Sequence, residues 1–331
     1  MNIHDIARIA GVSTSTVSRV VNSKPGVGKR KRELIEAIIR EHNFQPDETA
    51  RSLVTQSTRT IGILTDDLNS RRQNEGIARI ENEIMSAGYQ CFMKYIGEGE
   101  DAIEQGIADL ARRRVEGALL LGVRFRNHAL LAEALRRYLA DVPVVLMYQT
   151  ERIDMDNVYC VGADERRGFA HCIDRLYDAG RRYTALLIDL HRASEKQIQR
   201  YVQEAVARHP DMTCRVYTGI VPRVASGMEA MRRILQEYPQ VDSILSAQDA
   251  IAIGAMYECL DRGIAVPGQI SVIGEDNSAA CEACRPTLSS LDTMILATSN
   301  NSVRLLLDVL SGRACSHKMV LDMELVERES I

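Results

Sequence analysis

The sequence contains no run of apolar residues that approaches the roughly 18 needed to cross a bilayer. Its N-terminus also lacks the charged-then-apolar pattern of a secretory signal. We therefore expect a cytoplasmic protein with no membrane partner. Apolar residues make up 45% and charged residues 26% of the 331 residues, which is typical of a soluble protein that buries substantial cores.

Large aromatic and paired cysteine side chains are also scarce. Tryptophan is absent and there are four phenylalanines, so few flat side chains can stack on a ligand. The eight cysteines lack the close spacing of a disulfide framework, and Cys281 and Cys284 form the one CxxC pair. A closed zinc site needs four ligands. We expect reduced thiols and no metal, with a redox role for this pair as the alternative.

Motifs typical of enzymes are missing as well. The sequence has no G-x-x-x-x-G-K-[ST] phosphate loop, no zinc-type histidine pair and no G-x-S-x-G elbow. His171, His191 and His209 are too dispersed to suggest a catalytic triad. We expect a protein that is not an enzyme and uses no cofactor.

Charge is distributed unevenly along the chain. Residues 1–57 hold nine Lys/Arg and six Asp/Glu, a net charge of +3, whereas the remainder has a net charge of −7. A small basic head on an acidic body indicates that the head binds a polyanion and the body does not.

The basic head has the pattern of three short helices. Gly11 ends the first, Ser13 caps the second, and the third ends near residues 42–43. Two helices joined by a glycine-containing turn, with a third packed across them, predict a helix-turn-helix unit. The apolar stripes are formed by Ile6, Ile9 and Ala10, by Val17, Val20 and Val21, and by Leu34, Ile35, Ile38 and Ile39.

From Ile61 onward, buried-strand runs alternate with amphipathic helices. This alternation predicts parallel sheets covered by helices on both faces. Some 270 residues exceed one doubly wound unit, so we expect two similar subdomains. Ligands of such sheets bind at the carboxyl ends of the strands, here in the cleft between the subdomains.

Head and body together resemble the lactose-repressor/galactose-repressor family of bacterial transcription regulators. The head follows the family pattern with "DIARIAGVSTSTVSRVVN", "PGV", "AIIREHNFQPDETARSL" and "IGIL". The body matches it with "AGY", "RRVEGALLL", "VPVVLM", "VGAD", "AQDAIAIGAM", "VPGQISVIGEDN" and "ELVERES". These matches extend over essentially the whole chain.

The resemblance implies an all-α helix-turn-helix head at residues 1–45, a hinge helix or linker at 46–58, and an α/β body at 59–331. The body would contain two doubly wound parallel-sheet subdomains that resemble periplasmic sugar-binding proteins. Their expected limits are about 59–157 with 288–317, and about 158–287 with 318–331. A homodimer would bind a near-palindromic operator in double-stranded DNA, and a small effector in the cleft would gate this binding.

The second helix of the head carries the residue types that reach base edges in the major groove. Thr14 and Ser15 match the family's main operator-reading pair, and Arg19 can reach a guanine. The alternative is a capped and solvated helix, which the glycine turn and the basic neighbours disfavour. Further DNA contacts are expected from Ser13, Thr16, Ser18, Asn22, Lys29, Arg30 and Ala50.

In the hinge, Leu53 matches the family leucine that wedges into a central base step of the DNA. Burial of Leu53 between head and body is the alternative. Asp47 departs from the family's usual Asn or Ser; it brings an acid near phosphates, but as an N-cap it would help to order the hinge helix.

The cleft departs from the family pattern. Where relatives carry Ser-Asn-Pro and two aromatics, this chain reads "NSRRQ", so ring stacking on a sugar or purine is lost. The family's effector-gripping arginine is replaced by Ile198 in a gapless count, with Arg200 as the alternative if the loop is shifted. The expected effector-binding residues are Asn69, Arg71, Arg72, Gln73, Arg124, Ile198, Gln248, Asp249 and Asp276.

Arginines are frequent at the expected strand ends, namely Arg71, Arg72, Arg124, Arg126, Arg166 and Arg167. Clustered guanidinium groups suit a carboxylate or phosphate, which suggests an anionic effector such as a phosphosugar or an organic acid. One alternative is that these arginines pair with acids of the body. Another is a regulator without a small-molecule switch, controlled by a partner protein or by thiol oxidation. The chain ends without a heptad tail, so we expect a dimer rather than a tetramer.

Overall fold

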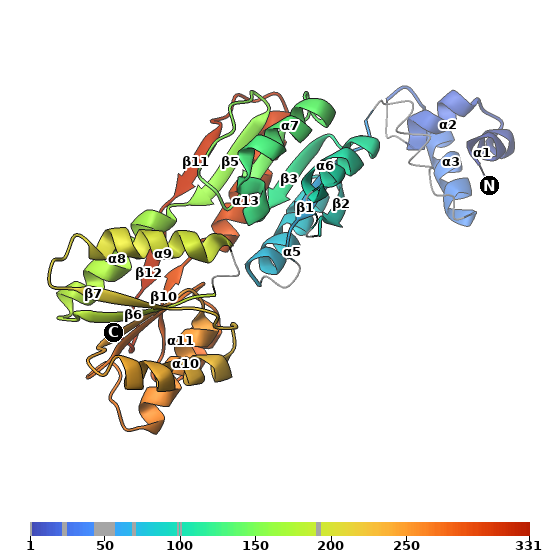
Figure 1. Cartoon of the computed structure of the whole chain (residues 1–331). Coiled ribbons are helices and arrows are strands. Elements are labelled where there is room, and N and C mark those ends of the chain that lie inside the picture. The colour runs from blue at the N-terminus through green and yellow to red at the C-terminus, as the bar shows by residue number, and fades with distance from the viewer. Residues whose placement is uncertain are drawn as a thin grey trace. The chain divides into compact units, whose positions relative to one another are not determined.

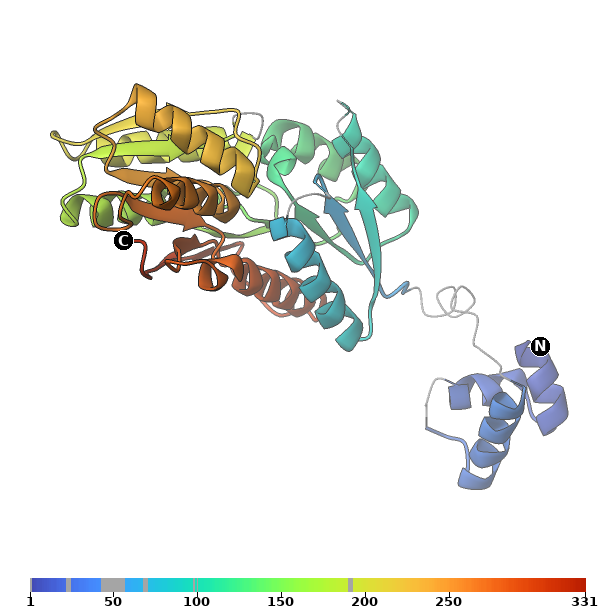
Figure 2. The ribbon, with the colours of Figure 1, turned by 90° about the horizontal axis from the view of Figure 1, so that it is seen from below.

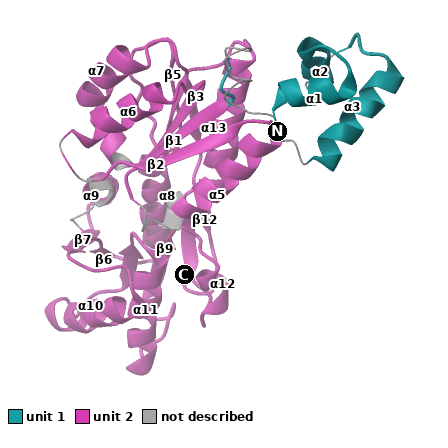
Figure 3. Cartoon of the chain, turned by 90° about the vertical axis from the view of Figure 1, so that its right-hand side faces the viewer, with its two compact units in different colours: residues 1–59 teal, residues 60–331 magenta. Residues whose placement is uncertain are grey.

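The computed structural model describes residues 2–21, 25–42, 57–67, 71–97, 99, 101–189 and 193–331. They form two compact units, residues 1–59 and 60–331, coloured separately in Figure 3. The expected hinge helix, with Asp47, Ala50 and Leu53, lies outside the described residues.

The first unit is the expected three-helix head, with α1 at Ile3–Ala10, α2 at Thr14–Val21 and α3 at Lys29–Glu41. Asn2 and Asp5 form a capping box at the start of α1, and Gly11 ends it in the left-handed conformation (φ +62°). Ile9 and Leu34 were expected in the apolar stripes, but both are about half exposed. The core of the head is formed by Ile6, Ala7, Val17, Val20, Ile35 and Ile38.

The second unit contains two six-stranded sheets (Figure 1). The first has the order β11-β5-β4-β3-β1-β2 and is parallel throughout. The second has the order β12-β10-β9-β8-β6-β7, with β12 antiparallel to β10. The strands are β1 Thr60–Thr65, β2 Gln90–Tyr95, β3 Gly117–Leu121, β4 Val144–Met147, β5 Val158–Ala163, β6 Tyr183–Leu187, β7 Thr213–Tyr217, β8 Ser243–Ser246, β9 Ser271–Glu275, β10 Ser289–Asp292, β11 Lys318–Leu321 and β12 Glu324–Val326.

Helices cover both faces of each sheet, as the buried strand runs predict. On the first sheet, α6 and α7 pack on one face, and α5 and α13 lie side by side on the other (Figure 2). On the second sheet, α8 and α9 cover one face and α10 and α11 the other. The helices are α5 Arg71–Ser86, α6 Ala102–Arg112, η1 Val123–Arg126, α7 His128–Tyr138, α8 Glu165–Asp178, α9 Ala193–Val206, α10 Val224–Glu237, α11 Asp249–Asp261, α12 Ala280–Ala283 and α13 Ile295–Leu310.

Small residues bring two of these helices into close contact. A Cβ on Gly227 of α10 would lie 2.2 Å from the carbonyl oxygen of Ile251 in α11. A Cβ on Gly254 of α11 would lie 2.0 Å from the carbonyl oxygen of Val224. A larger residue at either glycine would therefore force α10 and α11 apart.

The chain crosses between the two sheets later than the expected limits of 157/158, 287/288 and 317/318. β5 pairs with β4 in the first sheet, β10 pairs with β9 in the second, and β11 pairs with β5 in the first. The crossings therefore follow Ala163, Asp292 and Leu321. The strands are similarly apolar in both sheets, so apolar runs alone do not say which sheet receives a strand.

Candidate functional site

The surface of α2 in the head separates apolar from polar side chains. Val17 and Val20 are buried against α1 and α3, whereas Ser15 and Arg19 are exposed one helical turn apart. Thr14 is half-buried at the start of the helix. This arrangement leaves a polar strip on the outer side of α2, as the sequence predicts for a recognition helix.

Hydroxyl groups order the beginning of this helix. The Ser13 Oγ accepts a hydrogen bond from the Thr16 backbone N–H at 3.3 Å, which confirms Ser13 as a cap. The same Oγ lies 2.8 Å from the Ser15 hydroxyl and 2.9 Å from the Thr16 hydroxyl. The hydroxyls therefore hold one another in place at the end of the helix where base contacts are expected.

Cationic side chains are exposed at the start of α3 and at Arg19 of α2. Lys29 and Arg30 are exposed at the start of α3, whose cap residue Gly28 offers no side-chain hydrogen bond. Cations are unfavourable at a helix N-terminus because the helix dipole is positive there. Bound phosphates would offset this cost. Arg19 extends toward the loop before α3, where a Cβ on Gly26 (φ +98°) would lie 3.1 Å from its Nη1.

Other predicted site residues cannot be placed. Asn22, Ala50, Leu53 and Asn69 lie outside the described residues. The side chains of Arg71, Arg72 and Gln73, in the first turn of α5, also lie outside the described part.

The cleft edge of the first sheet begins with a buried carboxylate. Asp66 follows β1, and its Oδ2 accepts a hydrogen bond from the Arg124 backbone N–H at 2.8 Å. Gly122 (φ +133°) makes this contact feasible, because a Cβ there would lie 1.9 Å from the Asp66 Oδ1.

Arg124, an expected effector ligand, is used within the first subdomain. Its guanidinium donates to the carbonyl oxygens of Gly97 at 2.8 Å and Gly99 at 2.7 Å, and so holds the loop after β2. Arg124 is 25 or more residues away from both glycines in the sequence, so no local motif predicts these hydrogen bonds.

In the second subdomain, two predicted effector residues are also committed elsewhere. Asp249 is buried, and its carboxylate accepts hydrogen bonds from the Ser278 backbone N–H at 2.7 Å and the Ser290 hydroxyl at 2.6 Å. Ile198 is buried in the core between α8, α9 and the sheet, so it offers no surface to a ligand.

Gln248 and Asp276 lie at strand ends, as expected. Gln248 is half-buried two residues after β8, and its backbone N–H donates to the Ser246 hydroxyl at 3.3 Å. Asp276 follows β9 with φ +97° and accepts a hydrogen bond from the Thr293 hydroxyl at 3.2 Å. That Gln248 and Asp276 bind an effector stays a prediction.

A cavity of about 240 Å³ lies between the two subdomains, at the carboxyl ends of β4 and β5. We call it the inter-subdomain pocket. Among the predicted effector residues with described side chains, which are Arg124, Ile198, Gln248, Asp249 and Asp276, none lines this pocket. Its lining is Arg126, Tyr148, Gln149, Thr150, Glu151, Ala163, Asp164, Glu165, Arg166, Gln197 and Tyr201.

Arg126 bridges the subdomains at this pocket. From η1 of the first subdomain, it donates to the Gln197 side-chain oxygen on α9 and to the Tyr148 carbonyl oxygen at 2.8 Å. Its guanidinium also lies 3.6 Å from the Glu165 carboxylate at the start of α8. Charge-assisted hydrogen bonds of this kind contribute about 1.5–3 kcal/mol each.

Gln149 is the unusual residue of the pocket. Its side chain is 4% exposed, and its Oε1 lies 3.3 Å from the His128 Nε2. Its Nε2 is buried without a hydrogen-bond partner among the described residues. Leaving such a donor unpaired costs about 1–3 kcal/mol.

The lining also contains two tyrosines that are not among the predicted site residues. Tyr201 accepts a hydrogen bond from Gln197, and the Tyr148 hydroxyl lies 3.3 Å from the Ser299 hydroxyl of α13. Tyr148 has φ +58°, and strained backbone of this kind clusters at functional sites. For Tyr148 the sequence offers one signal, its position directly after a buried strand run. Tyr201 lies within α9 and has no such signal.

The remaining strand-end arginines pair with acids. Arg166 lies 2.9 Å from the Glu204 carboxylate, and Arg167 lies 2.8 Å from the Asp322 carboxylate. All four arginines with described side chains at these strand ends therefore have protein partners. The predicted anion-binding cluster of arginines thus loses most of its members, because Arg126, Arg166 and Arg167 pair with acids of the body and Arg124 donates to carbonyl oxygens.

The CxxC pair is unsuited to redox chemistry. Cys281 and Cys284 are buried, and burial raises the pKa of the Cys281 thiol to about 12. The Cys284 thiol donates to the Cys281 carbonyl oxygen at 3.3 Å. Across the described residues, no three His, Cys, Asp or Glu side chains gather closely enough to hold a metal ion.

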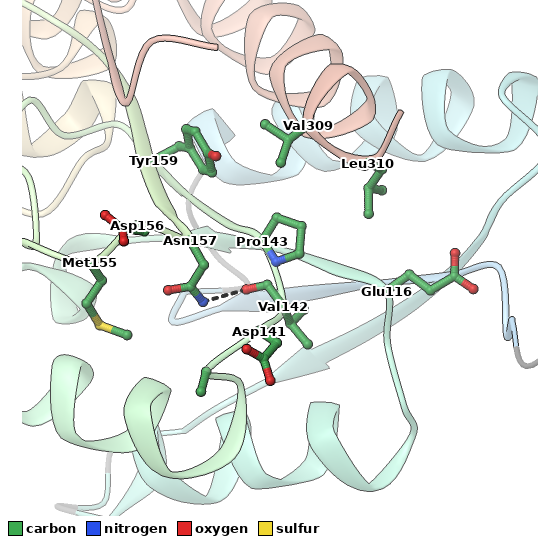
Figure 4. Close-up of a pocket in the computed structure, with 11 residues that line it drawn as sticks. Glu116, Asp141, Val142, Pro143, Met155, Asp156, Asn157, Tyr159, Val309 and Leu310 are labelled. Carbon is green, nitrogen blue, oxygen red and sulfur yellow. Dashed lines mark hydrogen bonds between the residues drawn. The ribbon is translucent and has the colours of Figure 1, made fainter. Parts of the chain in front are cut away.

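A second cavity, of about 930 Å³, lies at the other end of β4 (Figure 4). Asn157 donates two hydrogen bonds there, to the carbonyl oxygens of Leu139 at 2.8 Å and Val142 at 2.7 Å. All eleven lining residues are described, and none has a buried side-chain polar atom without a partner. It therefore lacks the unpaired donor found in the inter-subdomain pocket.

Comparisons with known proteins match the head and the body of the chain to two different domain families. A model of the lacI family of bacterial regulatory proteins matches residues 2–47, and a periplasmic binding protein-like domain matches residues 173–331. A transcriptional regulator from Lachnoclostridium phytofermentans is 24% identical and covers 100% of this chain and 99% of its own. The regulator IdnR of Escherichia coli is 26% identical, over 97% of this chain and 95% of its own.

Among solved structures, the lac repressor dimer bound to operator and an anti-inducer has a similar fold. Its TM-score is 0.88 at 23% identity, covering 100% of this chain and 98% of that one. Fold and matches define a DNA-binding transcriptional regulator with a periplasmic-binding-protein-like body. The chain carries a lacI-family DNA-binding domain and a periplasmic binding protein-like domain, and the relatives that it matches over nearly its whole length are transcriptional regulators rather than enzymes. No described helix has the length and apolar character needed to cross a membrane.

Proposed function

We propose that this regulator is a repressor that binds a near-palindromic operator as a homodimer. The observation that carries this proposal is the polar outer strip of α2, together with the exposed cations at the start of α3. In this arrangement Thr14, Ser15 and Arg19 read bases in the major groove. Contacts to phosphates come from Ser13, Thr16, Ser18, Asn22, Lys29 and Arg30, and hinge contacts from Ala50 and Leu53. The protein acts in the cytoplasm, on the nucleoid.

Dimer formation is supported by exposed apolar side chains at one edge of the first sheet. Met93 and Tyr95 are exposed on the edge strand β2, and Met85 is exposed on the neighbouring helix α5. Such a patch on a sheet edge is typical of an interaction surface. The similar lac repressor structure is a dimer on its operator.

A small effector in the cleft gates the affinity for DNA. Arg126 links the two subdomains across the cleft, so a ligand that changes these contacts also changes the equilibrium between subdomain arrangements. The buried Cys281 and Cys284 speak against the alternative of a thiol switch.

The salt dependence of DNA binding tests the proposal. Because phosphate contacts release counterions, the logarithm of the affinity should fall linearly with the logarithm of salt concentration. Six phosphate contacts would give a slope of about −5. Fluorescence anisotropy with a labelled duplex measures this slope, and binding that is insensitive to salt would contradict the proposal.

A further inference from the structure

We propose that the inter-subdomain pocket binds a small organic ammonium compound that also carries a neutral hydrogen-bond acceptor. The proposal deepens the proposed function, and it rests on that function only for the effect of the ligand on DNA binding. Its basis is one unpaired buried donor in a pocket where, among the described lining residues, the cations are paired and the carboxylates outnumber them.

The acceptor follows from Gln149. Its Oε1 is engaged by His128, and its buried Nε2 has no partner among the described residues. A buried amide N–H is strongly favoured to find an acceptor. Because Gln149 lines the pocket, a hydroxyl or carbonyl oxygen of a bound molecule can supply it.

The ammonium group follows from the charges of the lining. Both arginines of the lining form ion pairs. Arg126 pairs with Glu165, and Arg166 pairs with Glu204, which lies outside the lining. Glu151 is exposed at the pocket and makes no ion pair with any described residue. A carboxylate in this position favours a cation and disfavours an anion.

The start of α8 would ordinarily attract an anion to this pocket. Here two carboxylates of the chain already occupy that place. Asp164 caps the helix by accepting from the Arg167 backbone N–H at 3.0 Å, and Glu165 lies in its first turn. The positive end of the helix is therefore neutralised before any ligand arrives.

The size of the pocket limits the ligand. A volume of about 240 Å³ is smaller than that of sites for drug-sized molecules, which begin at about 300 Å³. A single six-membered ring with polar substituents is of suitable size. D-glucosamine, D-glucose and D-glucose 6-phosphate share one ring and differ in charge, so they serve as matched probes.

Calorimetric titration of the full chain, without DNA, tests the proposal. We expect D-glucosamine to bind about fivefold or more tightly than D-glucose, and D-glucose 6-phosphate to give no binding heat. Equal affinities for the amine and the neutral sugar, tighter binding of the phosphate, or silence of all three probes would overturn the proposal.

Two variants identify the groups involved. Glu151→Gln should reduce the affinity for D-glucosamine about fivefold and leave that for D-glucose unchanged. Gln149→Met should weaken both. Glu229→Gln, on the exposed surface of α10, is the matched control and should change neither. An unchanged preference for the amine in Glu151→Gln contradicts the assignment, and thermal melting shows whether each variant is folded.

DNA titrations separate this proposal from the proposed function. If D-glucosamine binds and DNA affinity stays constant, the pocket assignment holds and gating by this ligand is wrong. If the calorimeter is silent and another metabolite changes DNA affinity, gating holds and the pocket assignment is wrong.

Discussion

The head and the cleft treat their charged side chains in opposite ways. In the head, Arg19, Lys29 and Arg30 are exposed and make no ion pair with any described residue. In the cleft, Arg124 and Arg126 are engaged by carbonyl oxygens, an amide and a carboxylate. A surface that meets a polyanion can leave its cations unpaired because phosphates neutralise them. The described cations of the cleft are paired within the protein, so a ligand there meets the remaining groups, such as Gln149 and Glu151.

The largest expected effect comes from the core of the head. Ile35 is fully buried in a three-helix unit, and Ile35→Ala should destabilise it by about 2–5 kcal/mol. DNA binding should be abolished while the body stays folded. Hydrogen exchange measures whether each unit stays folded, and fluorescence anisotropy with operator DNA measures DNA binding. Leu34→Ala, at a 49% exposed neighbour, is the control and should have little effect; simultaneous loss of body structure would contradict the separation of the units.

Next in size is the loss of a base contact. Arg19→Ala should weaken operator binding by about 1–3 kcal/mol, roughly 5- to 150-fold, because a bidentate contact to guanine is lost. Binding to unrelated DNA should change much less. Competition titrations with operator and scrambled duplexes give both numbers.

The matched control is Arg8→Ala on α1, where the arginine pairs with Asp5 at 3.2 Å. It should leave discrimination between the two duplexes intact. If Arg8→Ala and Arg19→Ala reduce specificity equally, α2 does not read the bases.

A smaller effect is expected in the cleft. Arg126→Met removes the hydrogen bonds to Gln197 and Tyr148, and should lower the free energy of unfolding of the body by about 1–3 kcal/mol. Small-angle scattering should show wider separation of the subdomains. Arg166→Met breaks a pair within the second subdomain and should leave scattering unchanged; the reverse order of effects would show that Arg126 is not the bridge.

The smallest effect is predicted for the thiols. Mild oxidants should leave DNA affinity unchanged, because Cys281 and Cys284 are buried. The pKa of the Cys281 thiol is raised to about 12 from an ordinary value of 9.0, so the unfolded state loses its proton first. The stability that this group contributes is present below pH 9 and is lost as pH rises toward 12. Thiol titration with a colorimetric reagent, before and after unfolding, tests this, and rapid reaction of native Cys281 would contradict it.

Head and cleft also differ in how much of their structure the sequence could predict. The helices of the head follow from local signals, such as Ser13 as a cap and Gly11 as a stop. The parallel sheets follow from apolar runs separated by amphipathic helices. Signals of this kind act over a few residues, so one sequence is enough to recognise them.

The cleft depends on contacts between distant segments. Nothing near Arg124 in the sequence indicates that Gly97 and Gly99 will engage it, and nothing near Asp249 indicates Ser278 and Ser290. The predicted limits of the subdomains were wrong for the same reason. The sequences of β5 and β10 fit either sheet, so they do not show where the chain crosses between the sheets. Composition could suggest arginines in the cleft, but their partners are set by the tertiary fold.

Selection of binding sites from a pool of random DNA duplexes tests the central claim most directly. We expect the purified chain to enrich one near-palindromic sequence, and we expect Arg19→Ala to lose this enrichment while Arg8→Ala keeps it. Recovery of no common sequence, or enrichment that survives Arg19→Ala, would contradict the claim that α2 of this head reads DNA.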